Sequence, residues 1–97
     1  MPERQVRFTP SFFDRLDELL PAERGADGSL SATDFLLYEL PRMRDLLAVD
    51  FERNTLSADE TPVRLFVGAG ALVKSVALYA LIAPDGAVDV IWLLIDR

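Results

Sequence analysis

The 97-residue chain contains no cysteine and no histidine. Without cysteine it can form neither a disulfide framework nor a thiolate metal site, and a reducing cytoplasm is its natural setting. Without histidine it lacks the commonest general base, the usual activator of a nucleophile and the commonest metal ligand. We therefore expect an activity that needs neither a metal nor a cofactor.

Long hydrophobic runs are also missing. No apolar run approaches the roughly 18 residues that span a bilayer, and the N-terminal sequence MPERQVRF lacks the apolar core of a signal peptide. We expect a cytoplasmic protein without a membrane partner.

Basic residues are scarce, since 10 Lys and Arg face 16 Asp and Glu, a net charge of -6. Residues 1–62 carry 13 acids and 7 bases, whereas residues 63–97 carry three of each. Because nucleic-acid binding depends on neutralising phosphates with Lys and Arg, we expect no direct nucleic-acid binding. A protein partner is the better expectation. The length predicts one domain, residues 1–97.

The most apolar part of the chain predicts a β-meander, because 24 of the 35 residues from Val63 to Arg97 are apolar. Three runs rich in Val, Ile and Leu are separated by turn residues, which is typical of consecutive strands. The runs are 63–67, 72–82 and 87–95. The turns between them are Gly68-Ala69-Gly70 and Ala83-Pro84-Asp85-Gly86.

The preceding residues predict one strand and two helices. Val6 and Phe8 alternate with Arg7 in a strand over 4–9. Thr9 is a suitable helix cap and Pro10 a suitable first helical residue, so we expect a helix over 10–20. Ser31 and Asp34 resemble a capping box, and a second helix is predicted over 32–52. Pro41 predicts a kink in this helix or two short helices that meet at Leu40. Segments 22–30 and 54–61 are predicted to be loops.

This order predicts an α+β fold of two layers: a strand, a helix hairpin and a three-stranded antiparallel meander, β-α-α-β-β-β. Helices on one face leave the other sheet face open. By strict alternation, the last run places Val88, Val90, Trp92 and Leu94 on one side and Asp89, Ile91, Leu93 and Ile95 on the other. A free apolar face would mark a protein interface. The alternative is that sheet twist and flanking loops cover it.

Two stretches are similar to a known family. VRFTPSFFDRLDEL resembles the opening of RelE/ParE-type toxins, in which a first strand enters a helix through a Thr-Pro or similar step. VRLFVGAGALVKSVALYALIAPDGAVDVIWLLID resembles that family's arginine-bearing strand, aromatic-containing strand, DG turn and terminal strand. The resemblance spans nearly the whole chain. It implies a single RelE/ParE-like domain that is the toxin of a bacterial type II toxin-antitoxin pair and is neutralised by a cognate antitoxin.

That family divides into ribosome-dependent mRNA endonucleases and inhibitors of DNA gyrase. The nuclease sites are clusters of basic residues with Tyr or His, which stabilise negative charge without a metal. The matching positions here are sparse: Arg64, Lys74, Tyr79 and Arg97. The resemblance therefore favours a toxin that is not an enzyme and binds a protein target such as DNA gyrase. We expect partner contacts on the last two strands, centred on Val90, Ile91, Trp92 and Leu93.

Three alternatives stay open. The chain could be an mRNA endonuclease of the same family, an acidic inhibitor or DNA mimic, or a homodimeric module that uses the free sheet face. Gly68-Ala69-Gly70 lacks the following helix and the Lys-Ser/Thr pair of a phosphate loop, so a hairpin turn is the better interpretation.

Overall fold

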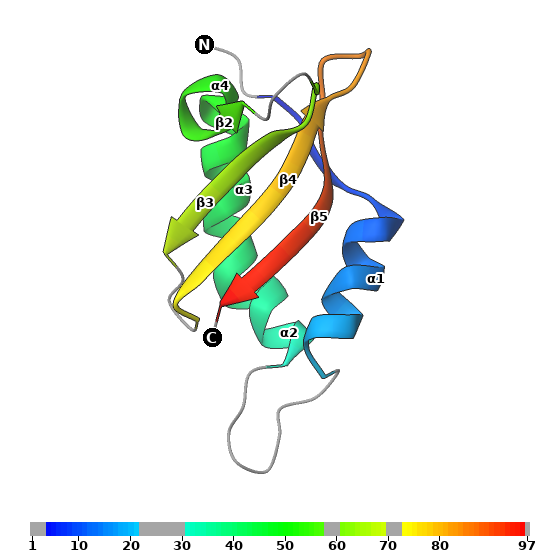
Figure 1. Cartoon of the computed structure of the whole chain (residues 1–97), viewed down its shortest axis with the longest axis vertical. Coiled ribbons are helices and arrows are strands. Elements are labelled where there is room, and N and C mark those ends of the chain that lie inside the picture. The colour runs from blue at the N-terminus through cyan, green and yellow to red at the C-terminus, as the bar shows by residue number, and fades with distance from the viewer. Residues whose placement is uncertain (1–3, 22–30, 58–60, 70–72, 97) are drawn as a thin grey trace.

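The computed structural model describes residues 4–21, 31–57, 61–69 and 73–96. Within these ranges, helices cover one face of a five-stranded mixed sheet, which confirms the α+β class (Figure 1). The elements, in chain order, are β1 (Val6–Phe8), α1 (Pro10–Leu19), α2 (Ala32–Asp34), the π-helical turn η1 (Phe35–Glu39), α3 (Leu40–Val49), α4 (Phe51–Asn54), β2 (Leu56–Ser57), β3 (Arg64–Ala69), β4 (Ser75–Ile82) and β5 (Val88–Asp96).

The strands lie in the order β1-β5-β4-β3-β2. The neighbours β3, β4 and β5 pair antiparallel, so the predicted meander is confirmed. The first strand joins the sheet beside the last one, with β1 parallel to β5 and Val6 opposite Val88. At the other edge β2 pairs antiparallel with β3, with Leu56 opposite Leu65. This strand lies inside the predicted loop 54–61, so that part of the loop prediction is wrong.

The first helix begins as predicted. The Thr9 side chain accepts a hydrogen bond from the Phe12 N–H, and Pro10 occupies the first turn, where its missing N–H has no helical partner to lose. Phe12 and Leu16 are buried, one helical turn apart. The helix ends at Leu19, two residues before Pro21.

The second helical segment begins at the predicted capping box. The Ser31 side chain accepts from the Asp34 N–H, and the Asp34 carboxylate accepts from the Ser31 N–H. Two helical stretches meet at Leu40, as one of the two predictions had it, since η1 ends at Glu39 and α3 begins at Leu40, just before Pro41. The turn before it widens to a π-helix, with the Leu40 N–H bonded to the Phe35 carbonyl, and α3 continues without an intervening loop. A wider turn relieves the clash of the proline ring with the preceding carbonyl. Asp50 then separates α3 from α4.

The core lies between the helices and the inner face of the sheet. Figure 1 shows α1 and α3 running in opposite directions, with α3 behind the sheet. The sheet contributes Phe66, Val76, Leu78, Ala80, Val88, Val90 and Leu93 to this core, all buried. The helices contribute Phe12, Leu16, Phe35, Met43, Leu47 and Phe51, among others. The predicted loop 22–30 and turn residue Gly70 lie outside the described residues. Gly68 and Ala69, also predicted as turn residues, instead extend β3 and pair with β4, so that part of the turn prediction is wrong. Among the helices that are described, none has the length and apolar character needed to cross a membrane.

Candidate protein-binding face

The face of the sheet opposite the helices, which Figure 1 views from the front, carries side chains in transverse rows. Strand pairing aligns Leu56, Leu65, Tyr79 and Trp92 across four strands, and we call these residues the aromatic row. It aligns Val67, Ala77 and Leu94 next to them, and we call these the alanine row. Cross-strand neighbours lie within contact distance, so each row is a continuous ridge.

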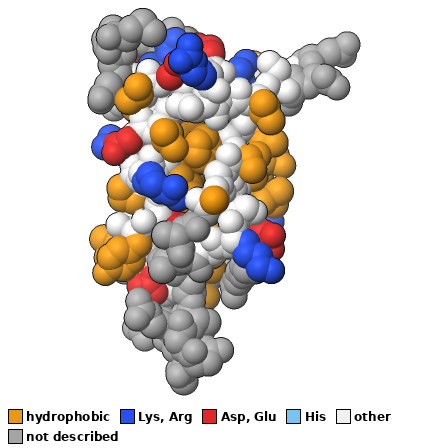
Figure 2. Space-filling model, turned by 90° about the vertical axis from the view of Figure 1, so that its left-hand side faces the viewer, with side chains coloured by type: hydrophobic (Ala, Val, Ile, Leu, Met, Phe, Trp, Pro, Cys, Tyr) orange, Lys and Arg blue, Asp and Glu red, His pale blue; other side chains and the backbone are white. Residues whose placement is uncertain are grey.

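Neither row contains a charged residue, although both reach solvent. The exposed fractions are 65% for Leu56, 56% for Val67, 42% for Leu94 and 37% for Trp92. In Figure 2 this face lies along the right-hand margin, where hydrophobic side chains gather. An antiparallel sheet with one solvated face normally alternates hydrophobic and polar residues. Contiguous exposed apolar surface of this kind marks interaction sites.

A β-bulge in β5 determines which of its side chains belong to this face. Tyr79 lies opposite Trp92, whereas Ala80 lies opposite Val90, so Ile91 is an extra residue on β5. A bulge reverses the alternation beyond it. Val88 and Val90 therefore point to the core before the bulge. Leu93 and Ile95 pack against the core after it, and Trp92 and Leu94 point outward. The predicted grouping of Trp92 and Leu94 with Val88 and Val90 is wrong for this reason.

The four residues predicted to bind a partner are consequently divided between the core and the surface. Val90 and Leu93 are fully buried, so they cannot contact a partner on the intact fold. Ile91 is half-buried and Trp92 is exposed, and these two remain available. The rows add residues that the sequence did not indicate. Leu56 was placed in a loop, and the outward direction of Leu94 depends on the bulge.

Side chains of α1 close the edge of β5 beyond the end of β1. The Ser11 hydroxyl donates to the Ile91 carbonyl at 3.0 Å, and the Arg15 Nε donates to the Leu93 carbonyl at 3.2 Å. The guanidinium carbon of Arg15 lies 4.8 Å from the centre of the Trp92 ring, a cation–π distance. An added strand would need these carbonyls as acceptors. The face of the sheet, and not this edge, is therefore open to a partner.

Paired charges border the aromatic row at the β1 side. Arg7 donates from Nε to Asp89 Oδ1 at 2.7 Å and from Nη1 to Asp85 Oδ2 at 2.9 Å. The hydrogen bond to Asp89 is the main cause that raises the pKa of Arg7. The pKa of Asp85 is lowered, chiefly because its carboxylate accepts from the Ala87 N–H. The ion pairs occupy Arg7 within the fold, so it is poorly placed to receive a phosphate.

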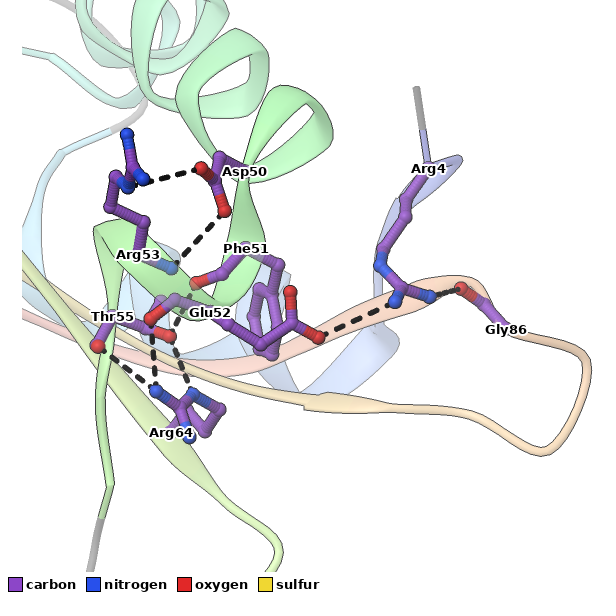
Figure 3. Close-up of polar contacts among 8 residues, drawn as sticks. All are labelled: Arg4, Asp50, Phe51, Glu52, Arg53, Thr55, Arg64 and Gly86. Atoms are coloured by element: carbon purple, nitrogen blue, oxygen red, sulfur yellow. Dashed lines mark hydrogen bonds and ion pairs between the residues drawn. The ribbon is translucent and has the colours of Figure 1, made fainter. Parts of the chain in front are cut away.

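Arg64, the first of the nuclease-type residues, is held by α4, Thr55 and β2, and Figure 3 shows its contacts with Glu52 and Thr55. Its Nε donates to Thr55 Oγ1 at 2.7 Å and its Nη1 to Ser57 Oγ at 3.1 Å. Its Nη2 donates to the carbonyls of Glu52 and Thr55 at 3.0 and 3.1 Å. All three guanidinium nitrogens are therefore used to satisfy the C-terminal end of α4 and the turn that follows it.

The structure does not bring the other nuclease-type residues to Arg64. Arg64 lies opposite Ala80, whereas Lys74 precedes Ser75, which lies opposite Ala69 at the far end of the β3–β4 hairpin. Tyr79 stands in the middle of the aromatic row. Arg97 is outside the described residues. The three placed residues thus form no common cluster that could hold a phosphate.

A groove of about 430 Å³ lies at the end of the molecule where β1, α4 and the β4–β5 turn meet. Arg4 crosses it, donating to the Gly86 carbonyl at 2.9 Å and pairing with Glu52 at 3.4 Å (Figure 3). Among the described residues no group of three or more acidic, His or Cys side chains is placed to hold a metal. Within the described part of the chain the groove thus offers no metal site, and we take the apolar rows as the candidate site.

Comparisons with known proteins add no relative to this description. No family model matches the chain, and no curated protein and no solved structure is significantly similar to it.

Proposed function

We propose that this chain is the toxin of a bacterial type II toxin-antitoxin pair of the RelE/ParE type. It acts by binding a protein target such as DNA gyrase, and a cognate antitoxin neutralises it. The finer RelE/ParE-like topology is part of the same proposal. Its support is the resemblance of the two stretches that form β1 with α1 and β3 with β4 and β5.

The observation that carries a binding function is the open apolar face. The two rows combine aromatic and aliphatic side chains without charge, and such a composition is typical of the centre of a protein interface. Trp92 is the natural anchor, because large aromatic residues dominate the binding energy of most interfaces. Ile91 and Leu94 lie beside it on β5.

Nuclease chemistry receives less support. A metal-independent nuclease stabilises a negative transition state with converging cations. Here Arg64 is occupied by four hydrogen bonds, and Lys74 lies at the opposite end of the hairpin. Binding therefore accounts for the site better than catalysis.

The test is induced expression of the chain in bacteria without an antitoxin, with growth as the readout. We expect the wild type to slow growth and Trp92→Glu to lose this effect while remaining folded by circular dichroism. Leu37→Glu is the matched control, because Leu37 is 61% exposed on the helical layer, and it should remain toxic. Val90→Glu should unfold the protein, because it buries an unpaired charge.

Two further assays separate the alternatives. Inhibition of DNA gyrase supercoiling by the purified protein would identify the target class. Cleavage of ribosome-bound mRNA by the wild type, lost in an Arg64→Ala variant that circular dichroism shows to be folded, would instead establish the nuclease branch. Absence of any growth effect from the soluble wild type would overturn the toxin proposal.

A further inference from the structure

We propose that Arg15 is a positioning residue of the candidate binding face, and that its guanidinium holds the Trp92 ring in the orientation that a partner contacts. Because Trp92 is the anchor of the proposed function, this role rests on that function. It gives α1 a part in binding, although no residue of α1 belongs to the aromatic row or the alanine row. Arg15 acts through Trp92 and needs no contact of its own with the partner.

The position of Arg15 on α1 brings it to the edge of β5. Ser11 and Arg15 lie one helical turn apart, on the flank of α1 that borders this strand. The Ser11 hydroxyl reaches the Ile91 carbonyl. The longer Arg15 side chain reaches the Leu93 carbonyl and also extends over the ring of Trp92. One side chain thus contacts both the edge of the strand and a ring on its open face.

The Arg15 side chain is itself fixed in place. Its Nε donates to the Leu93 carbonyl at 3.2 Å, and its Nη1 donates to Glu18 Oε2 at 3.3 Å. Two bonds from different nitrogens restrict the plane of the guanidinium. The side chain is only 22% exposed, and its guanidinium carbon lies 4.8 Å from the centre of the Trp92 ring. A cation at this distance attracts the ring, more strongly where water is partly excluded.

Trp92 lacks a cross-strand neighbour on the side where Arg15 lies. On β4 it is opposite Tyr79, but β1 ends at Phe8, which is opposite Val90. Arg15 therefore takes the place that a neighbouring strand would fill. The ring is 37% exposed. An exposed side chain that becomes ordered only on binding lowers the affinity by a factor of about 2 to 10, and a ring that is already held avoids this loss.

The motion of this ring can be measured directly, because Trp92 is the single tryptophan of the chain. Time-resolved fluorescence anisotropy of the purified protein gives an order parameter for the ring, which we expect at about 0.85 in the wild type, a value typical of rigid groups. Arg15→Gln removes the cation but keeps a donor for the Leu93 carbonyl. We expect the order parameter of this variant to fall to about 0.6 or less, a value typical of flexible groups.

Two further variants distinguish positioning of the ring from closure of the strand edge. Arg15→Lys keeps a cation that can stack on the ring but lacks the planar fork, so it should restore part of the order. Ser11→Ala removes the neighbouring hydrogen bond to β5 and no ring contact, so the order of Trp92 should equal that of the wild type. If Arg15 only closed the edge, Arg15→Gln would also show wild-type ring order.

The growth assay measures the consequence for binding. To halve the growth rate, Arg15→Gln should require at least about three times as much soluble protein per cell as the wild type, because the ring must then be ordered on binding. Arg53→Gln is the matched control. It makes the same substitution on α4, at a side chain that is 85% exposed, and it should require the same amount as the wild type.

Wild-type ring order in a folded Arg15→Gln variant would overturn the inference, and so would a loosened ring with undiminished toxicity. A wild type without any effect on growth would overturn the proposed function, and with it the role of Arg15 in binding. The anisotropy would still decide whether Arg15 holds the ring, since it is measured on the free protein. The two failures are therefore distinguishable.

Discussion

The sequence and the structure suggest different roles for Arg64. In the sequence it matches the arginine-bearing strand of a toxin family, whereas in the structure its guanidinium ties α4 and β2 to β3. Its partner Thr55 is buried and also contacts α4, because the Thr55 hydroxyl donates to the Phe51 carbonyl at 2.6 Å. Arg64 therefore has a structural role that explains its presence without catalysis.

This role predicts a loss of stability on truncation. Arg64→Ala leaves the Thr55 hydroxyl and carbonyl without their donor, and each lost hydrogen bond to a charged group costs about 1.5 to 3 kcal/mol before relaxation. We expect the free energy of unfolding in urea to fall by about 2 to 3 kcal/mol. Arg64→Lys should recover only part of it, because an ammonium cannot reproduce the planar fork.

Arg53→Ala is the control for this measurement, since the Arg53 side chain is 85% exposed and pairs with Asp50 at the surface. Exposed ion pairs contribute little, so the expected change is within about 0.5 kcal/mol. Unchanged stability of Arg64→Ala would contradict the structural role and return Arg64 to the list of functional candidates.

Asp85 makes stability depend on pH. Its pKa in the folded protein is lowered from the ordinary value of 3.8, first by the Ala87 N–H and also by Arg7. A lowered carboxyl pKa stabilises the fold above the unfolded pKa, and this stabilisation is lost as the pH falls through the folded pKa. Asp85→Asn should therefore melt at a lower temperature than the wild type at about pH 7 and approach it at about pH 2.5. An equal difference at both pH values would contradict this assignment.

The capping box at Ser31 starts the helical segment that contains α3. Both of its hydrogen bonds are formed, and Ser31 is buried. Ser31→Ala removes the acceptor for the Asp34 N–H and should lower the free energy of unfolding by about 1 to 2 kcal/mol. Thr33→Ala, an exposed substitution two residues later, should change it by less than about 0.5 kcal/mol. Equal effects of the two substitutions would show that the cap contributes nothing.

Elements that depend on local chemistry were predictable, and those that depend on distant partners were not. Thr9 with Pro10 and Ser31 with Asp34 define helix starts through residues within one turn. In contrast, β2 consists of two residues that are a strand only because Leu65 and Arg64 lie beside them. The bulge at Ile91 lies within a run apolar on both faces, where alternation carries no signal. The π-helical turn before Pro41, in contrast, is a local response to the proline ring, and an interruption was predicted there.

The same distinction applies to the candidate site. An open apolar sheet face was predictable from two-sided hydrophobicity in 72–82 and 87–95, and the aromatic and alanine rows lie there. The residues that form this face were not predictable, because the register of the strands decides which side chains share a row. Val90 and Leu93 were both expected to contact a partner and both lie in the core. Strict alternation would separate them, and the extra residue Ile91 between them places both on the core face.

For the whole molecule, the joining of the two ends of the chain is the contact of longest range. The parallel pair of β1 and β5 connects Val6 with Val88, and Arg4 and Arg7 reinforce it through Gly86 and Asp89. Bringing the two ends of the chain together costs conformational entropy, and the burial of β1 must offset that cost. Val6 and Phe8 pack against the core and supply that burial.

A variant that begins at Thr9 therefore loses both the strand β1 and the core packing that β1 provides. The removal of β1 withdraws Val6 and Phe8 from the core and bares the edge of β5 at Val88, where an unpaired apolar strand is prone to aggregate. Full burial of two such side chains contributes about 3 to 6 kcal/mol. Val6 and Phe8 are partly buried and supply a part of this, still a large fraction of the stability of a small domain. We expect the shortened chain to unfold without a cooperative urea transition and to aggregate.

In Gln5→Ala the substituted side chain is exposed, and this full-length control should unfold like the wild type. A shortened chain with the same transition and slope would mean that β1 lies against the sheet without stabilising it.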